Sequence, residues 1–102
     1  MPWTVPIEWL EKELEKEAVL AELDQSIQSY EEALNRFWNK NIPEKAGGQL
    51  AWWKAFRSNI QEEDVLWWFS SPKKTWDQAM GWAGFAIIRE GQLVDAIVTR
   101  QG

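Results

Sequence analysis

Apolar side chains recur at helical spacing through the first third of the chain. Steps of three and four residues connect the positions Leu20, Leu23, Ile27, Tyr30, Leu34 and Phe37. This spacing places them on one side of a helix as a single apolar stripe. Because no Gly or Pro interrupts residues 7–38, and Glu, Lys, Ala and Leu are frequent there, the pattern predicts a long helix over this range.

A second apolar stripe precedes the first and is out of phase with it. It comprises Ile7, Leu10 and Leu14, whereas the first stripe extended backwards falls on Lys16 and Glu13. Either the helix breaks or shifts register near residues 15–18, or its two halves face different neighbours. An unbroken helix would be about 50 Å long, which is long for a domain with a radius of gyration of roughly 13 Å. We therefore expect it to overhang, to bend or to contact a partner.

The remaining pattern predicts a second helix followed by three strands. Residues 39–48 contain Ile42-Pro43 and Gly47-Gly48 and indicate a connection, and residues 49–58 form the second helix. Residues 65–69 are apolar and rich in aromatic side chains, as in a strand. Thr75 and Gln78 have the spacing of a capping box, which indicates a helix of two turns ending near Gly81. Residues 84–89 and 92–100 then form a hairpin.

The hairpin register follows from a two-residue turn at residues 90–91, which places Arg89 opposite Gln92. In that register Phe85 and Ile87 share a face with Val94, Ala96 and Val98. Both faces are apolar, so we expect the short helix to cover one face and the N-terminal helices to cover the other. Strand 65–69 pairs either with a parallel neighbour through a crossover or antiparallel beside residues 93–99.

These elements define an α+β fold with a long N-terminal helix, a second helix and then β-α-β-β, with a three-stranded sheet that ends in a C-terminal hairpin. At 102 residues the chain is long enough for one core. We expect a single domain over residues 1–102, organised as an acidic helical arm over residues 1–40 and a tryptophan-rich α+β core over residues 41–102.

The charge distribution changes what the chain is expected to bind. The net charge is −5, and residues 1–35 carry nine acidic and two basic side chains, whereas residues 36–102 carry seven and nine. Without an overall basic character the chain is a poor match for nucleic acid. The N-terminus lacks the basic and apolar regions of a signal peptide, and no apolar run is long enough to span a bilayer. We expect a cytoplasmic protein with no membrane partner.

The composition also removes most catalytic and metal chemistry. The chain contains no Cys and no His, which excludes thiolate nucleophiles, imidazole bases and metal sites built from those ligands. The densest carboxylate run, residues 62–64, matches no calcium loop and indicates a solvated turn. Ser70 and Ser71 have no histidine to activate them, and Lys73 or Lys74 is the remaining candidate base. We therefore expect no catalytic residue, no metal site and no cofactor.

Nine tryptophans are the most unusual feature of the composition. They either fill the core, since aromatic rings bury large areas, or leave two to four rings exposed for recognition. Neighbouring rings in the pairs 52–53 and 67–68 cannot face the same way, and two further rings near the N-terminus lie outside the first apolar stripe. The candidates for an exposed set are Trp3, Trp9, Trp53 and Trp68.

The first apolar stripe is a second candidate surface, at Leu20, Leu23, Ile27 and Tyr30. It packs either against the second helix and the sheet of the same chain or against a second copy in a homodimer, because its spacing also suits a coiled-coil seam.

Taken together, these features predict a non-enzymatic protein-interaction module: an accessory, adaptor or regulatory subunit that binds an unidentified protein through its N-terminal helix or exposed tryptophans. One alternative is an acidic inhibitor or immunity protein whose carboxylates meet a basic partner, through Glu11, Glu13, Glu15 and Glu17. Another is a protein that stacks tryptophans on a sugar ring or a flat heterocycle.

Overall fold

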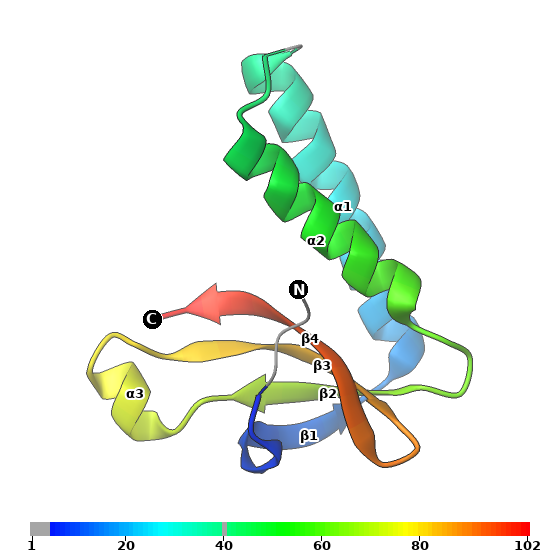
Figure 1. Cartoon of the computed structure of the whole chain (residues 1–102), viewed down its shortest axis with the longest axis vertical. Coiled ribbons are helices and arrows are strands. Elements are labelled where there is room, and N and C mark those ends of the chain that lie inside the picture. The colour runs from blue at the N-terminus through cyan, green and yellow to red at the C-terminus, as the bar shows by residue number, and fades with distance from the viewer. Residues whose placement is uncertain (1–4, 40) are drawn as a thin grey trace.

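A computed structural model describes residues 5–39 and 41–102 and confirms the α+β class (Figure 1). The sheet has four strands in the order β1-β2-β3-β4, and every neighbouring pair is antiparallel. A hairpin of two helices connects the first two strands, and a short helix connects the next two. The elements in chain order are the 3-10 helix η1 (Ile7–Trp9), β1 (Leu10–Leu14), α1 (Lys16–Trp38), α2 (Glu44–Asn59), β2 (Val65–Ser70), α3 (Lys73–Asp77), β3 (Trp82–Arg89) and β4 (Gln92–Gln101).

Residues 7–14 form a single turn of 3-10 helix and a strand instead of an α-helix, so the predicted three-stranded sheet gains a fourth strand, β1. The backbone of Glu15 is extended (φ −71°, ψ 120°), and α1 begins at the next residue, within the predicted break. In β1, Leu10 lies opposite Phe69 and Leu14 lies opposite Leu66. The hydrogen bonds and packing of the sheet outweigh the high helix propensity of this Leu-Glu-Lys-Glu-Leu segment. The two stripes were out of phase because they belong to different elements.

The helices α1 and α2 pack side by side as an antiparallel hairpin, which we call the arm from here on in place of the predicted arm over residues 1–40. The far end of this arm lies away from the sheet (Figure 1). The second helix was predicted to begin at residue 49, but α2 begins at Glu44 and includes Gly47 and Gly48. Pro43 precedes its first turn, a position that proline tolerates because no intrahelical bond is lost there.

The β3–β4 hairpin has the predicted turn and a different register beyond it. Glu90 and Gly91 both have positive φ (54° and 79°), as a type I′ hairpin turn requires, and Arg89 pairs with Gln92. An irregularity after Ile87 then shifts the pairing by one residue, so that Phe85 lies opposite Ile97 rather than Ala96. The predicted face assignment of β4 was wrong beyond this point.

The strand β2 pairs antiparallel with β3, which replaces both arrangements predicted for it. The connecting helix α3 is shorter than predicted and begins after Pro72. It lies at one end of the sheet and covers neither face (Figure 1). Trp76 of α3 donates hydrogen bonds from Nε1 to Ser70 Oγ (3.0 Å) and to the carbonyl of Ser71 (3.1 Å).

Both faces of the sheet are nevertheless covered. The base of the arm covers one face, where the fully buried side chains Leu23, Leu66 and Ile87 form the main cluster with Phe56. The chain that precedes β1 covers the other face, where Val5 packs with Phe69, Ala86 and Ala96. The second cluster is thinner, and its remaining members are half-buried: Trp9, Leu10, Trp67, Leu93 and Val98.

Candidate interaction site

A groove separates the arm from the last strand of the sheet. One wall carries Trp52 and Trp53 of α2, and the other carries Ile97 and Val98 of β4. The groove has a volume of about 350 Å³, which falls within the range of small ligand or side-chain pockets. Polar groups complete its rim: Lys45, Gln49 and Gln101, together with Gly48.

The two tryptophans of this groove differ because adjacent helical residues point in different directions. Trp53 is half-buried against the main core cluster. Trp52 lies beside it and is 55% exposed. One member of the pair is thus excluded from the core, as predicted, but it is Trp52 and not Trp53. An exposed Trp beside an apolar groove is the arrangement expected of a binding hot spot.

The strand β4 forms an open edge of the sheet next to this groove. It pairs with β3 on one side, and none of the described strands pairs with its other side. Asp95 accepts a hydrogen bond from the neighbouring N–H of Ala96 (2.8 Å) and another from Asn59 Nδ2 (3.3 Å). The strand residues that line the groove, Ile97, Val98 and Gln101, therefore lie beyond this polar contact.

The opposite edge strand, β1, has the features by which natural proteins prevent the pairing of an edge strand with another chain. β1 has only five residues, a register irregularity between Leu10 and Lys12, and three consecutive charged side chains, Glu11, Lys12 and Glu13. Short length, bulges and charges all oppose the addition of another strand. β4 is twice as long, and its only charged side chains are Asp95 and Arg100. The edge at β4 is thus the better template for an added strand.

Lys45 places a positive charge at the rim of the groove. Among residues 5–39 and 41–102, four ion pairs join Lys54 to Glu31, Arg57 to Asp24, Lys73 to Asp77 and Arg89 to Asp64. Lys45 takes part in none of them and forms no ion pair with any residue that the structure describes. Its charge therefore favours a ligand that brings a carboxylate to the rim.

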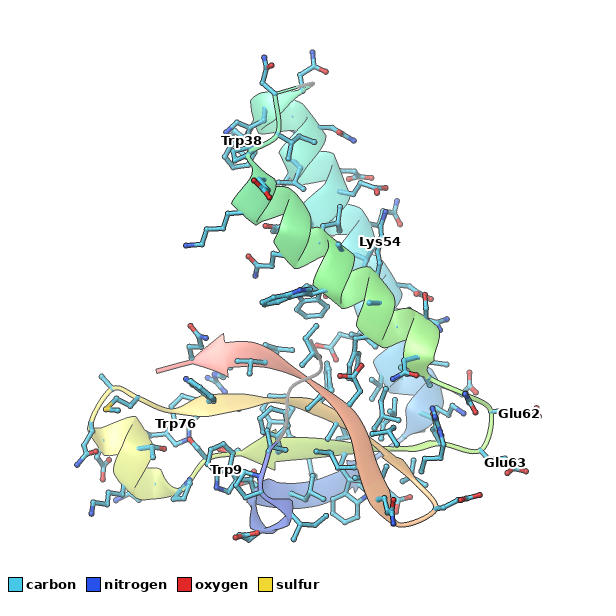
Figure 2. The ribbon with its side chains drawn as sticks, viewed as in Figure 1. Trp9, Trp38, Lys54, Glu62, Glu63 and Trp76 are labelled. Carbon is cyan, nitrogen blue, oxygen red and sulfur yellow. The ribbon has the colours of Figure 1, made fainter. Side chains whose placement is uncertain are left out.

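A second group of exposed apolar side chains lies at the far end of the arm. Phe37 is 74% exposed, Trp38 42% and Ile42 37%, and the two rings contact edge to face at 6.2 Å between centroids. Figure 2 shows Trp38 at this end, remote from the sheet. Phe37 is the last position of the predicted stripe, and it is exposed because α1 ends one residue later.

The predicted surface on the stripe lies mostly inside the arm. Leu23 is fully buried, and Leu20, Ile27 and Tyr30 are half-buried. The hydroxyl of Tyr30 donates to the carbonyl of Ala46 (3.3 Å) or to Gln49 Oε1 (3.4 Å) in α2. Within one chain the stripe packs against α2 and the sheet, and a homodimer through it stays a prediction.

The predicted tryptophan set is not brought together. Trp9 is half-buried in the cluster beneath the N-terminal segment, and Trp68 is half-buried in the main cluster, where it contacts Phe85. Trp3 lies outside the described residues. Among the described tryptophans the exposed ones are Trp38, Trp52 and Trp82. No sequence signal distinguished Trp52 from Trp53, because the choice depends on which way α2 faces the sheet.

The carboxylate run at residues 62–64 is only partly the solvated turn that was predicted. Glu62 and Glu63 are exposed on the loop before β2 (Figure 2), but Asp64 is buried. It accepts two hydrogen bonds of 2.8 Å from Arg89 and one of 2.7 Å from the N–H of Gln61. These bonds lower the pKa of Asp64, with Arg89 as the main cause, while burial opposes them. Asp64 is therefore a structural residue.

The described part of the chain contains no group of three Asp or Glu side chains close enough to hold a metal ion, and none of its helices could cross a bilayer. When the chain was compared with protein-family models, curated proteins and solved structures, none of them matched it.

Proposed function

We propose that this protein is a non-enzymatic protein-interaction module that binds an extended segment of a partner protein along the outer edge of β4. The observation that carries the proposal is the open edge of β4 lying next to an apolar groove that contains a 55% exposed tryptophan, Trp52. Strand addition of this kind draws affinity from main-chain hydrogen bonds and specificity from pockets that receive alternate side chains.

The groove specifies the chemistry of the bound segment. An apolar or aromatic side chain of the partner would lie between Trp52 and Val98, where it is removed from water. A carboxylate within a few residues of that side chain would reach Lys45 at the rim. The segment would pair with the C-terminal half of β4, because Asp95 already bonds the N–H of Ala96.

Selection of binding peptides from a random library tests the proposal without knowledge of the natural partner. We expect selected peptides to combine an apolar anchor with an acidic residue and to protect amide protons of residues 97–101 from exchange. Trp52→Ala and Val98→Lys should abolish binding, whereas Met80→Ala, which removes an even more exposed apolar side chain elsewhere, should not. Peptides that bind the Trp52→Ala variant equally well, or a library that yields no binder, would refute it.

A second copy of the chain could occupy the same edge, and the experiment separates this case. Sedimentation across a concentration series should show a monomer if the groove takes a foreign segment. A dimer that Trp52→Ala disrupts would instead show that the edge joins two copies, and the proposal of a foreign segment would fall.

The acidic-inhibitor alternative has a separate observation in its favour. Glu11, Glu13, Glu15 and Glu17 lie on β1 and at the start of α1, all are exposed, and none forms an ion pair with a described residue. A basic partner would associate faster at low salt, and replacing these four residues with Gln should remove that salt dependence. Unchanged association kinetics in the variant would exclude this alternative.

A further inference from the structure

A second cavity lies on the other side of the arm, between α1 and the sheet. It measures about 330 Å³ and is separate from the groove at β4, since the two share no residue. Its apolar lining comes from four elements, β1, α1, β2 and β3. The lining residues are Leu14, Ala18, Val19, Trp68 and Phe85, and the charged side chains at its rim are Lys12, Glu15 and Glu22.

The aromatic part of this lining is held in place by the sheet. Trp68 of β2 and Phe85 of β3 are paired across the two strands, and their rings meet edge to face at 5.7 Å between centroids. Phe85 is buried, while Trp68 remains half-buried and borders the cavity. Aromatic rings that are fixed in this way attract cations as well as aliphatic groups.

The rim carries more negative than positive charge. Glu15 and Glu22 form no ion pair with a described residue. Lys16, which follows Glu15 in the chain, is engaged elsewhere, because its ammonium group donates to the carbonyls of Gln61 and Glu62. Among the described residues that line the cavity, Lys12 is the only cation. The charged groups at the rim are therefore two carboxylates and one ammonium group, with a net charge that is negative.

We infer that this cavity binds the side chain of an arginine from a partner protein, with its aliphatic stem against Trp68 and Val19 and its guanidinium group between Glu15 and Glu22. An apolar, aromatic lining with carboxylates at the rim matches a side chain that is apolar along its stem and cationic at its end. The inference is independent of the proposed strand addition at β4. It also assigns a specific binding role to Glu15, one of the four exposed glutamates of the acidic-inhibitor alternative.

The direct test uses N-acetyl-arginine amide as the probe and its neutral counterpart N-acetyl-citrulline amide as the control. Two-dimensional NMR resolves the indole N–H signals of the tryptophans, and Trp68→Phe identifies that of Trp68. We expect the arginine probe to shift this signal in a saturable manner and the citrulline probe to leave it unchanged. No shift with arginine, or an equal shift with both probes, would overturn the inference.

Substitutions of the charged rim residues should change the affinity for the arginine probe in opposite directions, depending on the charge that is removed. Glu15→Gln and Glu22→Gln should each weaken binding of the arginine probe, by roughly twofold to fivefold, because both carboxylates are exposed to water. Lys12→Gln should strengthen it by a similar factor. Glu31→Gln, on the same helix but away from the cavity, should have no effect. If Glu31→Gln weakens binding as much as Glu15→Gln and Glu22→Gln do, the effect is one of net charge and a specific site is refuted.

Discussion

Arg89 at the end of β3 holds Asp64 through two hydrogen bonds of 2.8 Å, one from Nε and one from Nη2. The same Nη2 group donates to the carbonyl of Asn59 at 3.0 Å. Arg89 thereby joins the last residue of α2, the loop that follows it and the sheet. This fork fixes the base of the arm relative to the sheet, and the groove at β4 depends on that placement.

Removing the carboxylate from this contact should destabilise the protein. In Asp64→Ala, Arg89 loses its charged partner and the N–H of Gln61 loses its acceptor, which should cost about 2 kcal/mol of unfolding free energy. Urea titrations of both proteins measure the difference. Glu63→Ala changes a neighbouring exposed carboxylate and is the control, with an expected change within about 0.5 kcal/mol. Equal effects of the two substitutions would contradict the structural role of Asp64.

The same contact predicts how stability depends on pH. Arg89 holds the pKa of folded Asp64 below its ordinary value of 3.8, so the folded state binds this proton less tightly than the unfolded state. The stabilisation is complete above the ordinary pKa and is lost as pH falls through the lower folded pKa. Between pH 6 and pH 3 the wild type should therefore lose more unfolding free energy than Asp64→Ala. If the unfolding free energies of the wild type and Asp64→Ala fall by the same amount between pH 6 and pH 3, the pKa of Asp64 is not lowered.

Two positions of the same helical stripe should respond very differently to truncation. Leu23 is fully buried in the main cluster, and Leu23→Ala should cost about 3 kcal/mol of unfolding free energy. Phe37 is 74% exposed at the end of α1, and Phe37→Ala should change stability by less than about 0.5 kcal/mol. Chemical denaturation measures both. A large loss with Phe37→Ala would mean that the stripe packs along its whole length.

Local sequence patterns were sufficient to predict a helix over residues 16–38, a second helix over residues 49–58, the strands from residue 65 onward and the hairpin turn. The turn at Glu90-Gly91 depends on a glycine that accepts positive φ without steric cost, and α1 depends on an uninterrupted period of apolar side chains. These properties are set by near neighbours in the chain. They are therefore visible without knowledge of the fold.

The remaining features depend on contacts between distant residues. Leu10–Leu14 has the composition of a helix and becomes a strand because β2 offers it a partner about 55 residues away. The shift after Ile87 changes which side chains of β4 share a face with Phe85. The choice of Trp52 over Trp53 as the exposed ring follows from the path of α2 across the sheet. The sequence showed that one ring of the pair was excluded from the core, and the fold determined which one.

Two glycines offer a matched test of the backbone geometry. A Cβ atom at Gly84 would lie 1.9 Å from the carbonyl oxygen of Ile97, a backbone atom of β4 that cannot move aside freely. Gly84→Ala should therefore destabilise the sheet by about 2 kcal/mol or more. Gly48 lies within α2 with nothing inside 4 Å of such an atom, and Gly48→Ala should stabilise the protein by about 1 kcal/mol. Thermal denaturation of both variants checks the opposite signs, and a neutral Gly84→Ala would contradict the close approach of β3 and β4.

Fluorescence quenching by acrylamide tests the exposure of Trp52, on which the proposed binding site depends. Trp52 and Trp38 are 55% and 42% exposed, whereas Trp67 is half-buried beneath the N-terminal segment. Trp52→Phe and Trp38→Phe should each lower the quenchable fraction of the emission, and Trp67→Phe should change it less. A peptide bound along β4 should protect the wild type from quenching and leave Trp52→Phe unaffected, because the peptide would cover that ring. If Trp52→Phe quenches like the wild type, the ring is already shielded from solvent and the groove is not open to a partner.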